Sequence, residues 1–389
     1  MVRISKVAQS IKPSLTRKLF NMAKSYDDVI DFTLGDPDVP TPFAIKEAGC
    51  KAIIESKTRY SQNAGLLPLR ETISNYVNAK ESLSYSAEKE ILVSVGAMEG
   101  LYLALLALID EGDEVIIPAP YYVNYKQMVE MCHGNAVVVE ETNDSDGLLC
   151  TFDSIKKSVT YKTKAIIINT PCNPTGKVYS QDFLENIALL AKQKDLVIIT
   201  DEVYKCLVYN QKSRPLSIAK IEGMKERTIF VNSLSKEFCM TGWRLGYVCG
   251  PENIISAMTK LQENIAACAP LPSQYAAIEA LNPEKDYSKS MVDIFSKRRN
   301  ALLECFSQIP QLHVKEPEAT FYAMVDISET GMGSEEFAYT LLENAHVAVV
   351  PGITYGNCCD KYIRIAFTIE EDLIREGVNR IGEFVRTLA

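Results

Sequence analysis

The chain has 389 residues, of which 47% are hydrophobic and 23% charged, and its formal net charge is −9. This length predicts a globular protein of two domains, since domains average roughly 100–200 residues. The acidic balance argues against binding to nucleic acid or an anionic membrane surface, both of which require a basic face. No stretch approaches the ~20 consecutive apolar residues that span a bilayer, and no signal-peptide segment is evident. We therefore expect a cytoplasmic protein.

The eleven cysteines are scattered along the chain, and no CxxC pair occurs among them. This usage is typical of free thiols in a reducing compartment and argues against both a disulfide framework and a structural metal site. No metal ligands are expected.

The middle of the chain alternates segments typical of helices with segments typical of strands. Glu99–Ile109 is apolar nearly all round, which predicts a buried helix. Ser180 is an expected N-cap for an amphipathic helix over Gln181–Gln193. Short runs rich in β-branched residues lie at Glu114–Pro118, Ala136–Val139, Ala165–Asn169, Leu196–Thr200 and Thr228–Val231. The alternation predicts an α/β fold whose mainly parallel sheet is covered on both faces.

The last hundred residues predict a second, smaller α+β unit. A helix is expected over Tyr287–Phe306, and a terminal helix over Glu370–Leu388. Between them lie strand-like runs at Thr320–Val325, Val347–Val350 and Tyr362–Phe367. We expect a large domain over residues 45–285. We also expect a small domain over residues 286–389, with the N-terminal residues 1–44 packed against it.

The strongest chemical signal is the string NSLSKEFCMTGWRLGY at Asn232–Tyr247. It follows an expected strand and places Lys236 in a turn of small residues. A buried ammonium costs free energy unless it is paired or neutral, and a neutral amine is a nucleophile that forms an imine with an aldehyde. Ser233 and Arg244 are suited to hold a phosphate beside it. A lysine at such a place, taken alone, is typical of a surface residue beside a strand end, and it is the surrounding string that favours the chemical interpretation.

A second signal is Asp201-Glu202-Val203-Tyr204, directly after the expected strand Leu196–Thr200. The carboxyl ends of parallel strands are where open α/β sheets bind ligands. Pyridoxal phosphate requires an anion at its pyridine nitrogen, and Asp201 can supply it. Tyr204 can donate to the ring hydroxyl. An isolated aspartate at this place can also be a helix cap.

Two further strings follow expected strands. NTPCNPTG at Asn169–Gly176 contains two X-Pro bonds, which favour a cis peptide that would fix Asn173 against a ligand; a plain turn is the alternative. VSVGAMEGL at Val93–Leu101 predicts a strand, a glycine turn and the start of a helix. Backbone N–H groups at such a helix start can bind an anion. In this string, the backbone N–H groups at the turn and helix start belong to Gly96, Ala97 and Met98.

These strings resemble the class I and II aminotransferases, which are fold-type I enzymes dependent on pyridoxal phosphate. The resemblance covers nearly the whole chain, and the strings occur in the family's order. Besides those above, it includes LGDPDVPTP (Leu34–Pro42), TRYSQNAGLLPLR (Thr58–Arg70), PAPYYVNY (Pro118–Tyr125), VVPG (Val349–Gly352) and YIRIAF (Tyr362–Phe367). The family fold is a large domain with a mainly parallel sheet and a small domain built from both termini.

The resemblance implies a role for each matching position. Lys236 matches the lysine that forms the imine and moves a proton between the substrate Cα and the cofactor. Asp201 matches the partner of the pyridine nitrogen, and Asn173 and Tyr204 match the contacts to the ring hydroxyl. Tyr122 matches the aromatic residue that stacks on the ring, where many members have tryptophan.

The remaining matches concern the phosphate and the substrate. Phosphate contacts are implied for Gly96, Ala97, the backbone of Met98, Ser233 and Arg244. Tyr60 matches a tyrosine that reaches the phosphate of a neighbouring subunit, which implies a homodimer. Arg364 matches the arginine that binds the substrate α-carboxylate, and Gly35 and Asn173 match further substrate contacts.

The expected activity is transfer of an amino group from an L-amino acid to a 2-oxo acid such as 2-oxoglutarate. An aspartate aminotransferase is the first expectation, with aromatic or alanine aminotransferases as alternatives. Some aspartate-specific relatives have lysine where this chain has Met98. Arg17 and Arg59 are other cations for a distal carboxylate, although each is typical of a solvated residue. A pyridoxal-phosphate C–S β-lyase and a noncatalytic binding module remain the other classes.

Overall fold

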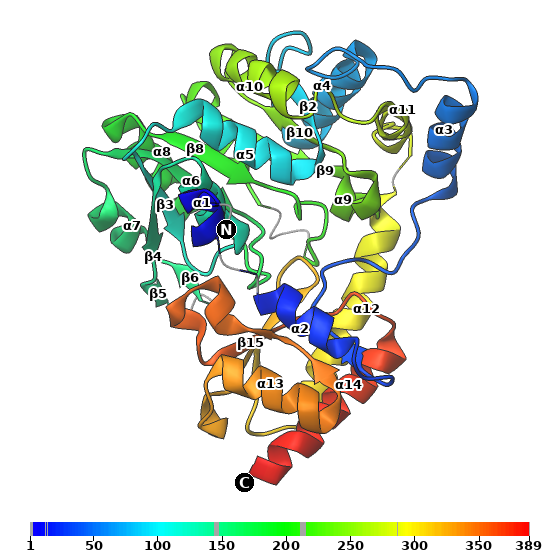
Figure 1. Ribbon diagram of the computed structural model, residues 1–389, viewed down its shortest axis with the longest axis vertical. Coiled ribbons are helices and arrows are strands. Elements are labelled where there is room, and N and C mark those ends of the chain that lie inside the picture. Colours follow the sequence, from blue (N-terminus) through cyan, green and yellow to red (C-terminus); the bar gives the residue numbers. More distant parts are fainter. Residues whose placement is uncertain are drawn as a thin grey trace.

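The computed structural model describes residues 3–11, 13, 15–143, 148–210, 215–285 and 287–388. They form a larger α/β unit and a smaller α+β unit (Figure 1), in agreement with the expected fold class. The expected boundary between the domains falls at residue 286, which lies outside the described residues. No helix in the described part of the chain is long and apolar enough to cross a membrane. All eleven cysteines are free thiols.

A seven-stranded sheet in the order β2-β10-β9-β8-β7-β3-β4 forms the centre of the larger unit. Its strands are β2 (Ile91–Ser94), β3 (Glu114–Pro118), β4 (Asn135–Val139), β7 (Thr163–Asn169), β8 (Val197–Asp201), β9 (Thr228–Ser233) and β10 (Gly246–Cys249). Five of them, β3, β4, β7, β8 and β9, run parallel. β10 is antiparallel to both of its neighbours. The sequence did not predict β10, because this short run includes a glycine and lacks the β-branched repetition of the other strands.

The inner parallel strands β3, β7, β8 and β9 are largely buried, as their continuous apolar runs predicted, whereas the edge strand β4 is only partly buried. In β7, Ala165 and Ile167 pack with α5, α6 and α10, whereas Ile166 and Ile168 pack with α7 and α8 on the opposite face. The helices of this unit are α3 (Phe43–Ile54), α4 (Leu67–Glu81), α5 (Gly96–Leu108), α6 (Asn124–Met131), α7 (Phe152–Ser158), α8 (Gln181–Lys194), α9 (Leu234–Glu237), α10 (Glu252–Ile265) and α11 (Leu271–Ala280). Ser180 caps α8 as expected, because its side chain accepts from Phe183 N.

The smaller unit has a four-stranded antiparallel sheet in the order β11-β12-β15-β14. Its strands are β11 (His313–Lys315), β12 (Tyr322–Asp326), β14 (Val350–Pro351) and β15 (Tyr362–Ala366). Its helices are α12 (Ser288–Phe306), α13 (Ser334–Ala345) and α14 (Glu371–Leu388). They enclose a core of fully buried aromatic and aliphatic side chains, including Phe295 and Phe337.

The expected single strand Val347–Val350 is wrong, because two short strands in different sheets replace it. β13 (Val347–Ala348) pairs in parallel with β1 (Ile30–Asp31), and β14 pairs with β15. The N-terminal β1 therefore takes a place beside β13 that the local sequence does not reveal. The remaining pair joins β5 (Thr142–Asn143) to β6 (Leu149–Cys150).

The N-terminal segment reaches the smaller unit through its second helix, α2, whereas α1 is drawn in front of the larger unit (Figure 1). It begins with α1 (Lys6–Ser10), none of whose residues is buried, and continues with α2 (Leu15–Ala23). Leu19 and Ala23 are buried and fix α2 against the core of the smaller unit. The short 3₁₀ helices are η3 (Ile218–Lys220), η4 (Lys225–Arg227), η5 (Thr241–Trp243), η6 (Ser328–Thr330), η7 (Gly352–Tyr355) and η8 (Asn357–Cys359).

Candidate active site

A cavity of about 460 Å³ lies at the carboxyl ends of the central parallel strands. Asn169, Asp201 and Ser233 are the last residues of the neighbouring strands β7, β8 and β9, and all three line it. The smaller unit contributes Tyr322 and Arg364 to the same cavity. Its place at the strand ends and its volume are typical of a small-molecule site.

Lys236 enters the cavity from α9, the short helix that follows β9. Its Nζ donates a hydrogen bond to the Gly35 carbonyl at 2.6 Å and lies 5.5 Å from the centroid of the Phe321 ring. Gly35 cannot carry a side chain here, because a Cβ would lie 1.7 Å from the Tyr322 hydroxyl oxygen. The lysine is thus held by the N-terminal segment, 201 residues away in sequence.

Asp201 is a buried carboxylate, only 5% exposed. Its Oδ2 accepts from the Tyr125 hydroxyl at 2.6 Å, and its Oδ1 accepts from Val203 N at 3.3 Å. Burial raises its pKa to about 6, and these two hydrogen bonds oppose the rise. No basic side chain of the described residues forms an ion pair with it. A cation bound beside Asp201 would stabilise its ionised form.

Arg364 is a buried cation on β15, only 5% exposed. Its Nη1 donates to Asn173 Oδ1 at 3.2 Å, and its Nη2 donates to the Thr33 carbonyl at 2.5 Å. Its Cζ lies 4.3 Å from the centroid of the Tyr322 ring. Its Nε has no hydrogen-bond partner, and no carboxylate of the described residues pairs with it. A buried guanidinium without an anion is suited to bind one from solution.

Asn173 and Tyr204 lie in the same wall of the cavity. The backbone N–H of Asn173 donates to Asn169 Oδ1 at 2.8 Å, in the loop that the NTPCNPTG string forms. The predicted cis peptide is confirmed at Thr170–Pro171. The Tyr204 hydroxyl lies 3.0 Å from the Tyr322 hydroxyl, and burial raises its pKa well above the usual value. Tyr204 therefore stays protonated and can donate a hydrogen bond.

The expected phosphate contacts gather at the start of α5. Gly96 is its first residue and has a φ of +75°, and a Cβ there would lie 2.7 Å from Arg244 Nη2. Arg244 is exposed and holds a left-handed conformation, with its Nη1 donating to the Thr241 carbonyl at 2.8 Å. Ser233 Oγ donates to the Leu245 carbonyl at 3.2 Å. The helix start, an arginine and hydroxyl groups together are suited to an anion.

Tyr122 and Met98 are in contact with each other in the cavity lining. Asn124 Nδ2 lies 3.0 Å from the Tyr122 hydroxyl and 3.3 Å from Met98 Sδ. The Tyr122 hydroxyl lies 3.4 Å from the same sulfur. Burial raises the pKa of Tyr122 to about 12, so the phenol is neutral at pH 7.

Most of the predicted site residues come together in this cavity. Those that line it are Gly35, Ala97, Met98, Tyr122, Asn173, Asp201, Tyr204, Ser233, Lys236, Arg244 and Arg364. Gly96 lies directly beside Arg244. Tyr60 is not brought to the cavity of its own chain, since it is 87% exposed and absent from the lining.

Sequence reasoning missed several lining residues, among them Thr33, Tyr125, Ser235 and Tyr322. Ser235 directly precedes Lys236 in the SLSK string, and that position was a usable signal. Tyr125 lies in the PAPYYVNY string without an assigned role, although it donates to Asp201. Tyr322 had no signal, because tyrosine is common in strands.

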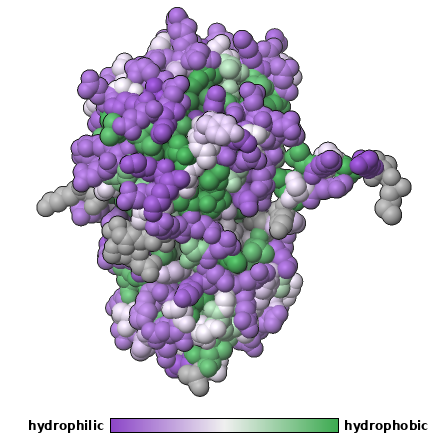
Figure 2. Space-filling view, turned by 90° about the vertical axis from the view of Figure 1, so that its left-hand side faces the viewer, coloured by the Kyte–Doolittle hydropathy of each residue, from purple (hydrophilic) through white to green (hydrophobic). Residues whose placement is uncertain are grey.

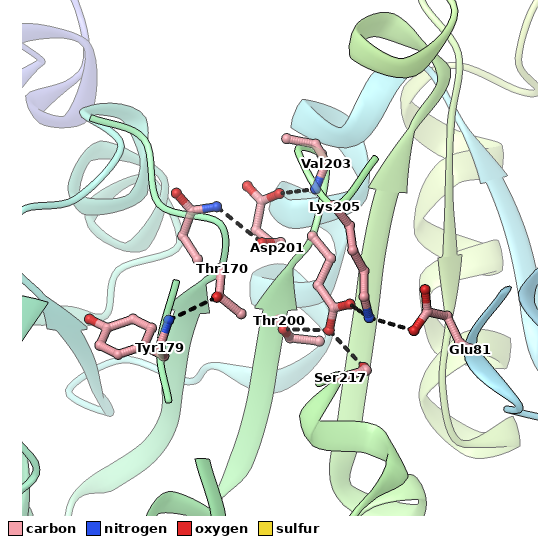
Figure 3. A network of polar contacts seen from close by, with 10 residues as sticks. Glu81, Thr170, Tyr179, Thr200, Asp201, Val203, Lys205 and Ser217 are labelled. Carbon is pink, nitrogen blue, oxygen red and sulfur yellow. Dashed lines mark hydrogen bonds and ion pairs between the residues drawn. The ribbon is translucent and has the colours of Figure 1, made fainter. Parts of the chain in front are cut away.

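The adjacent Glu202 belongs to a different network, which Figure 3 shows beside Asp201. Its Oε2 lies 2.6 Å from Lys205 Nζ, which lies at the same distance from Glu81 Oε2. The hydroxyls of Thr200 and Ser217 donate to its Oε1 at 3.0 and 2.7 Å. Glu202 is thus paired by groups of the protein itself and does not line the cavity.

The cavity fits the expected cofactor in three respects. No basic side chain in the described part of the chain pairs with the Asp201 carboxylate, which suits a protonated pyridine nitrogen. The start of α5 beside Arg244 suits a phosphate. The Lys236 amine, in the same cavity, suits an aldehyde.

Comparisons with known proteins agree with this geometry. A family model described as aminotransferase class I and II matches residues 27–381. An aspartate aminotransferase of Pyrococcus abyssi is 39% identical, over 97% of this chain and 96% of its own. An aromatic-amino-acid aminotransferase of Thermococcus litoralis is 35% identical, over 97% of both chains. The solved structure of a Thermus thermophilus aspartate aminotransferase mutant superimposes with a TM-score of 0.93 at 33% identity, over 98% of this chain and 100% of that one.

Proposed function

The chain belongs to the class I and II aminotransferase family, whose members use pyridoxal 5′-phosphate, and on that premise we propose that it transfers the amino group of aspartate to 2-oxoglutarate at the cavity described above. The observation that carries the proposal is Arg364. It is a buried guanidinium with a free Nε and no carboxylate partner among the described residues, in one cavity with Lys236 and Asp201.

When bound, pyridoxal phosphate supplies an electron-poor ring that stabilises charge on the substrate carbon that loses its proton. The Asp201 carboxylate holds the proton on the ring nitrogen. Tyr204 donates to the ring hydroxyl, as does Asn173 through its Nδ2, because its Oδ1 already accepts from Arg364. Gly96, Ala97, Ser233 and Arg244 hold the phosphate. The backbone of Met98 continues the same helix start.

Lys236 performs the proton transfers. Its Nζ would hold the cofactor through the aldehyde, and the free amine would remove the proton from the substrate Cα as a general base. The same amine, once protonated, would serve as the general acid. Its place beside the Gly35 carbonyl puts it next to the segment that contacts Arg364 through Thr33. Arg364 would bind the α-carboxylate and so fix the orientation of the substrate in the cavity.

Two arginines, Arg364 and Arg244, line the cavity together with Lys236, and each is suited to bind an anion. An amino acid whose carboxylate binds at Arg364 therefore presents its amino group to the cofactor. The apolar residues Met98, Leu101 and Val123 in the lining favour a second candidate, an aromatic or alanine donor.

The test is reconstitution of the protein with pyridoxal phosphate, followed by a panel of amino donors with and without 2-oxoglutarate. Borohydride reduction with mass spectrometry of the Lys236 peptide gives an independent measure of covalent attachment. We expect glutamate to form with aspartate in the presence of the acceptor. Release of pyruvate and ammonia without an acceptor would instead identify a C–S β-lyase. Absence of an adduct at Lys236 would contradict the proposal.

A homodimer with shared active sites is part of the proposal. Phe43, Ile53, Ile54 and Tyr60 expose between 57% and 87% of their surface on and after α3. The face seen in Figure 2, on the side of the molecule away from α3, is by contrast mainly hydrophilic with scattered apolar patches. Tyr60 would then reach the phosphate in the partner subunit. Analytical ultracentrifugation of the parent protein should give the mass of a dimer, and Ile54→Lys should shift the mass toward that of the monomer. A monomeric mass for the parent protein would contradict the proposal.

A further inference from the structure

The cavity has more basic side chains than the cofactor and substrate groups assigned so far can occupy. Four of the five charged side chains in its lining are basic, and they are Arg17, Lys236, Arg244 and Arg364. The proposed function gives Lys236 to the cofactor aldehyde, Arg244 to the phosphate and Arg364 to the α-carboxylate. Asp201 takes the ring nitrogen. Arg17 is then the one charged lining residue of the described chain that has no counter-ion.

Arg17 belongs to α2, which the N-terminal segment places over the cavity. Leu19 is fully buried two residues later and fixes the helix to the smaller unit. The Arg17 side chain is exposed, its Cζ lies 5.4 Å from the centroid of the Phe20 ring, and no carboxylate of the described residues pairs with it. It is therefore free to bind an anion that enters the cavity.

The structure also distinguishes Arg17 from Arg59, the other arginine that the sequence suggested for binding a distal carboxylate. Both are exposed, but only Arg17 lines the cavity. Met98 supplies no charge at the position where some aspartate-specific relatives have lysine. A cation for a second carboxylate must then come from another element, and α2 provides one.

A second donor faces the same space from the start of α6. The two N–H groups of Asn124 point at the Tyr122 hydroxyl and at Met98 Sδ, at 3.0 and 3.3 Å. A thioether is a weak acceptor. If Asn124 Nδ2 donated to a carboxylate oxygen in place of Met98 Sδ, the hydrogen bond would be charge-assisted. Such a bond is roughly twice as strong as a neutral one.

We propose that Arg17 and Asn124 bind the distal carboxylate of diacid substrates, which selects 2-oxo and amino dicarboxylic acids over monoacids of similar size. This inference rests on the proposed function and names its substrate class. An acyclic diacid has one anionic group for Arg364 and one for Arg17. An apolar side chain would leave Arg17 without a counter-ion in the loaded cavity.

The decisive measurement is a ratio. For the holoenzyme we compare kcat/KM for 2-oxoglutarate with kcat/KM for pyruvate as acceptors. Arg17→Gln should lower this ratio about 10- to 100-fold, the range expected for a lost hydrogen bond to a charged group. Asn124→Ala should lower it about two- to tenfold. Arg17→Lys keeps the charge and should restore most of the ratio.

Binding gives a readout that does not depend on turnover. Calorimetric titration of the holoenzyme with glutarate and with valerate compares a diacid with a monoacid of the same chain length. Arg17→Gln should weaken glutarate binding by a similar factor and leave valerate binding close to that of the parent enzyme. Lys18→Gln is the matched control, because it removes a neighbouring charge that lies over the Tyr339 ring and not in the cavity lining.

Each outcome separates this inference from the proposed function. If the parent enzyme transaminates but Arg17→Gln leaves the ratio unchanged, the distal site is refuted and the aminotransferase stands. If Arg59→Gln lowers the ratio instead, the cation is Arg59, and the assignment to Arg17 is wrong. A parent enzyme without preference for diacids also refutes it. Failure of the parent to carry the cofactor at Lys236 would refute the proposed function itself.

Discussion

Asp201 and Glu202 are adjacent buried carboxylates at the end of β8, and their surroundings differ in one respect. Glu202 faces Lys205, Thr200 and Ser217, so the protein supplies its counter-ion and its hydrogen bonds (Figure 3). Asp201 faces the cavity with hydrogen bonds from Tyr125 and Val203 and no cation. Burial raises the pKa of both carboxyls.

The difference shows how to distinguish a structural charge from a ligand-binding one. A buried ion that is fully paired within the chain contributes to the fold, and its removal leaves a partner unpaired. A buried ion whose pairing is incomplete marks the place where a ligand completes it. Arg364, which lines the same cavity, is the positive counterpart of Asp201, since it also lacks an ion-pair partner among the described residues.

The largest expected effect is on the cavity side. Lys236→Ala removes the amine that carries the cofactor and moves the proton, so kcat should fall at least about 10⁴-fold, the upper range for a general base. Steady-state assays of the reconstituted variant measure this. Lys220→Ala, which removes an exposed amine elsewhere, is the control and should retain activity. Transamination by Lys236→Ala at the parent rate would disprove the role of Lys236.

Disruption of the ion-pair network around Glu202 should instead lower the stability of the fold. Lys205→Met leaves Glu202 and Glu81 buried without their shared cation, which should lower the free energy of unfolding by about 3–5 kcal/mol. Urea denaturation of the purified variant measures the loss. Lys285→Met, which breaks an exposed pair with Glu279, should cost less than about 1 kcal/mol. An equal loss of unfolding free energy in the two variants would show that the buried network stabilises the fold no more than the exposed ion pair does.

Substitution of Arg364 should weaken substrate recognition. Arg364→Leu should cost about 2–5 kcal/mol in transition-state binding, measured as the fall in kcat/KM, since it leaves a substrate carboxylate unpaired. Arg364→Lys keeps the charge but loses the planar pair of donors, so an intermediate loss is expected. An unchanged kcat/KM in Arg364→Leu would place the substrate carboxylate elsewhere.

The smallest expected effect is a pH dependence. The pKa of Asp201 in the cofactor-free protein is raised to about 6 by burial, so the group is protonated below that pH. A protonated carboxyl cannot pair with the charged ring nitrogen, and cofactor affinity should therefore fall as pH drops from 7 to 5, by up to about tenfold per unit. Asp201→Asn should bind weakly and lack this component of the dependence. The same slope in both proteins would assign it to another group, such as the phosphate.

The sequence predicted the elements and residues that follow a local rule. Five strands of the large sheet, α8 with its Ser180 cap and the position of Asp201 follow from apolar runs and from the rule that ligands bind at strand ends. The pairing of β1 with β13 joins residues more than 300 positions apart, and local patterns carry no record of it. Tyr322 reaches Tyr204 across 118 residues for the same reason. The position of Tyr60 relative to a partner chain remains a prediction.

The strand β15 has a further consequence because it follows the whole seven-stranded sheet in the chain. Arg364 comes from β15, whereas the residues it meets, Thr33 and Asn173, are made far earlier. Larger units generally begin to fold while synthesis continues. A nascent chain can thus complete the α/β sheet and its Lys236 turn long before Arg364 emerges. The growing polypeptide gains substrate recognition only after β15 has been made.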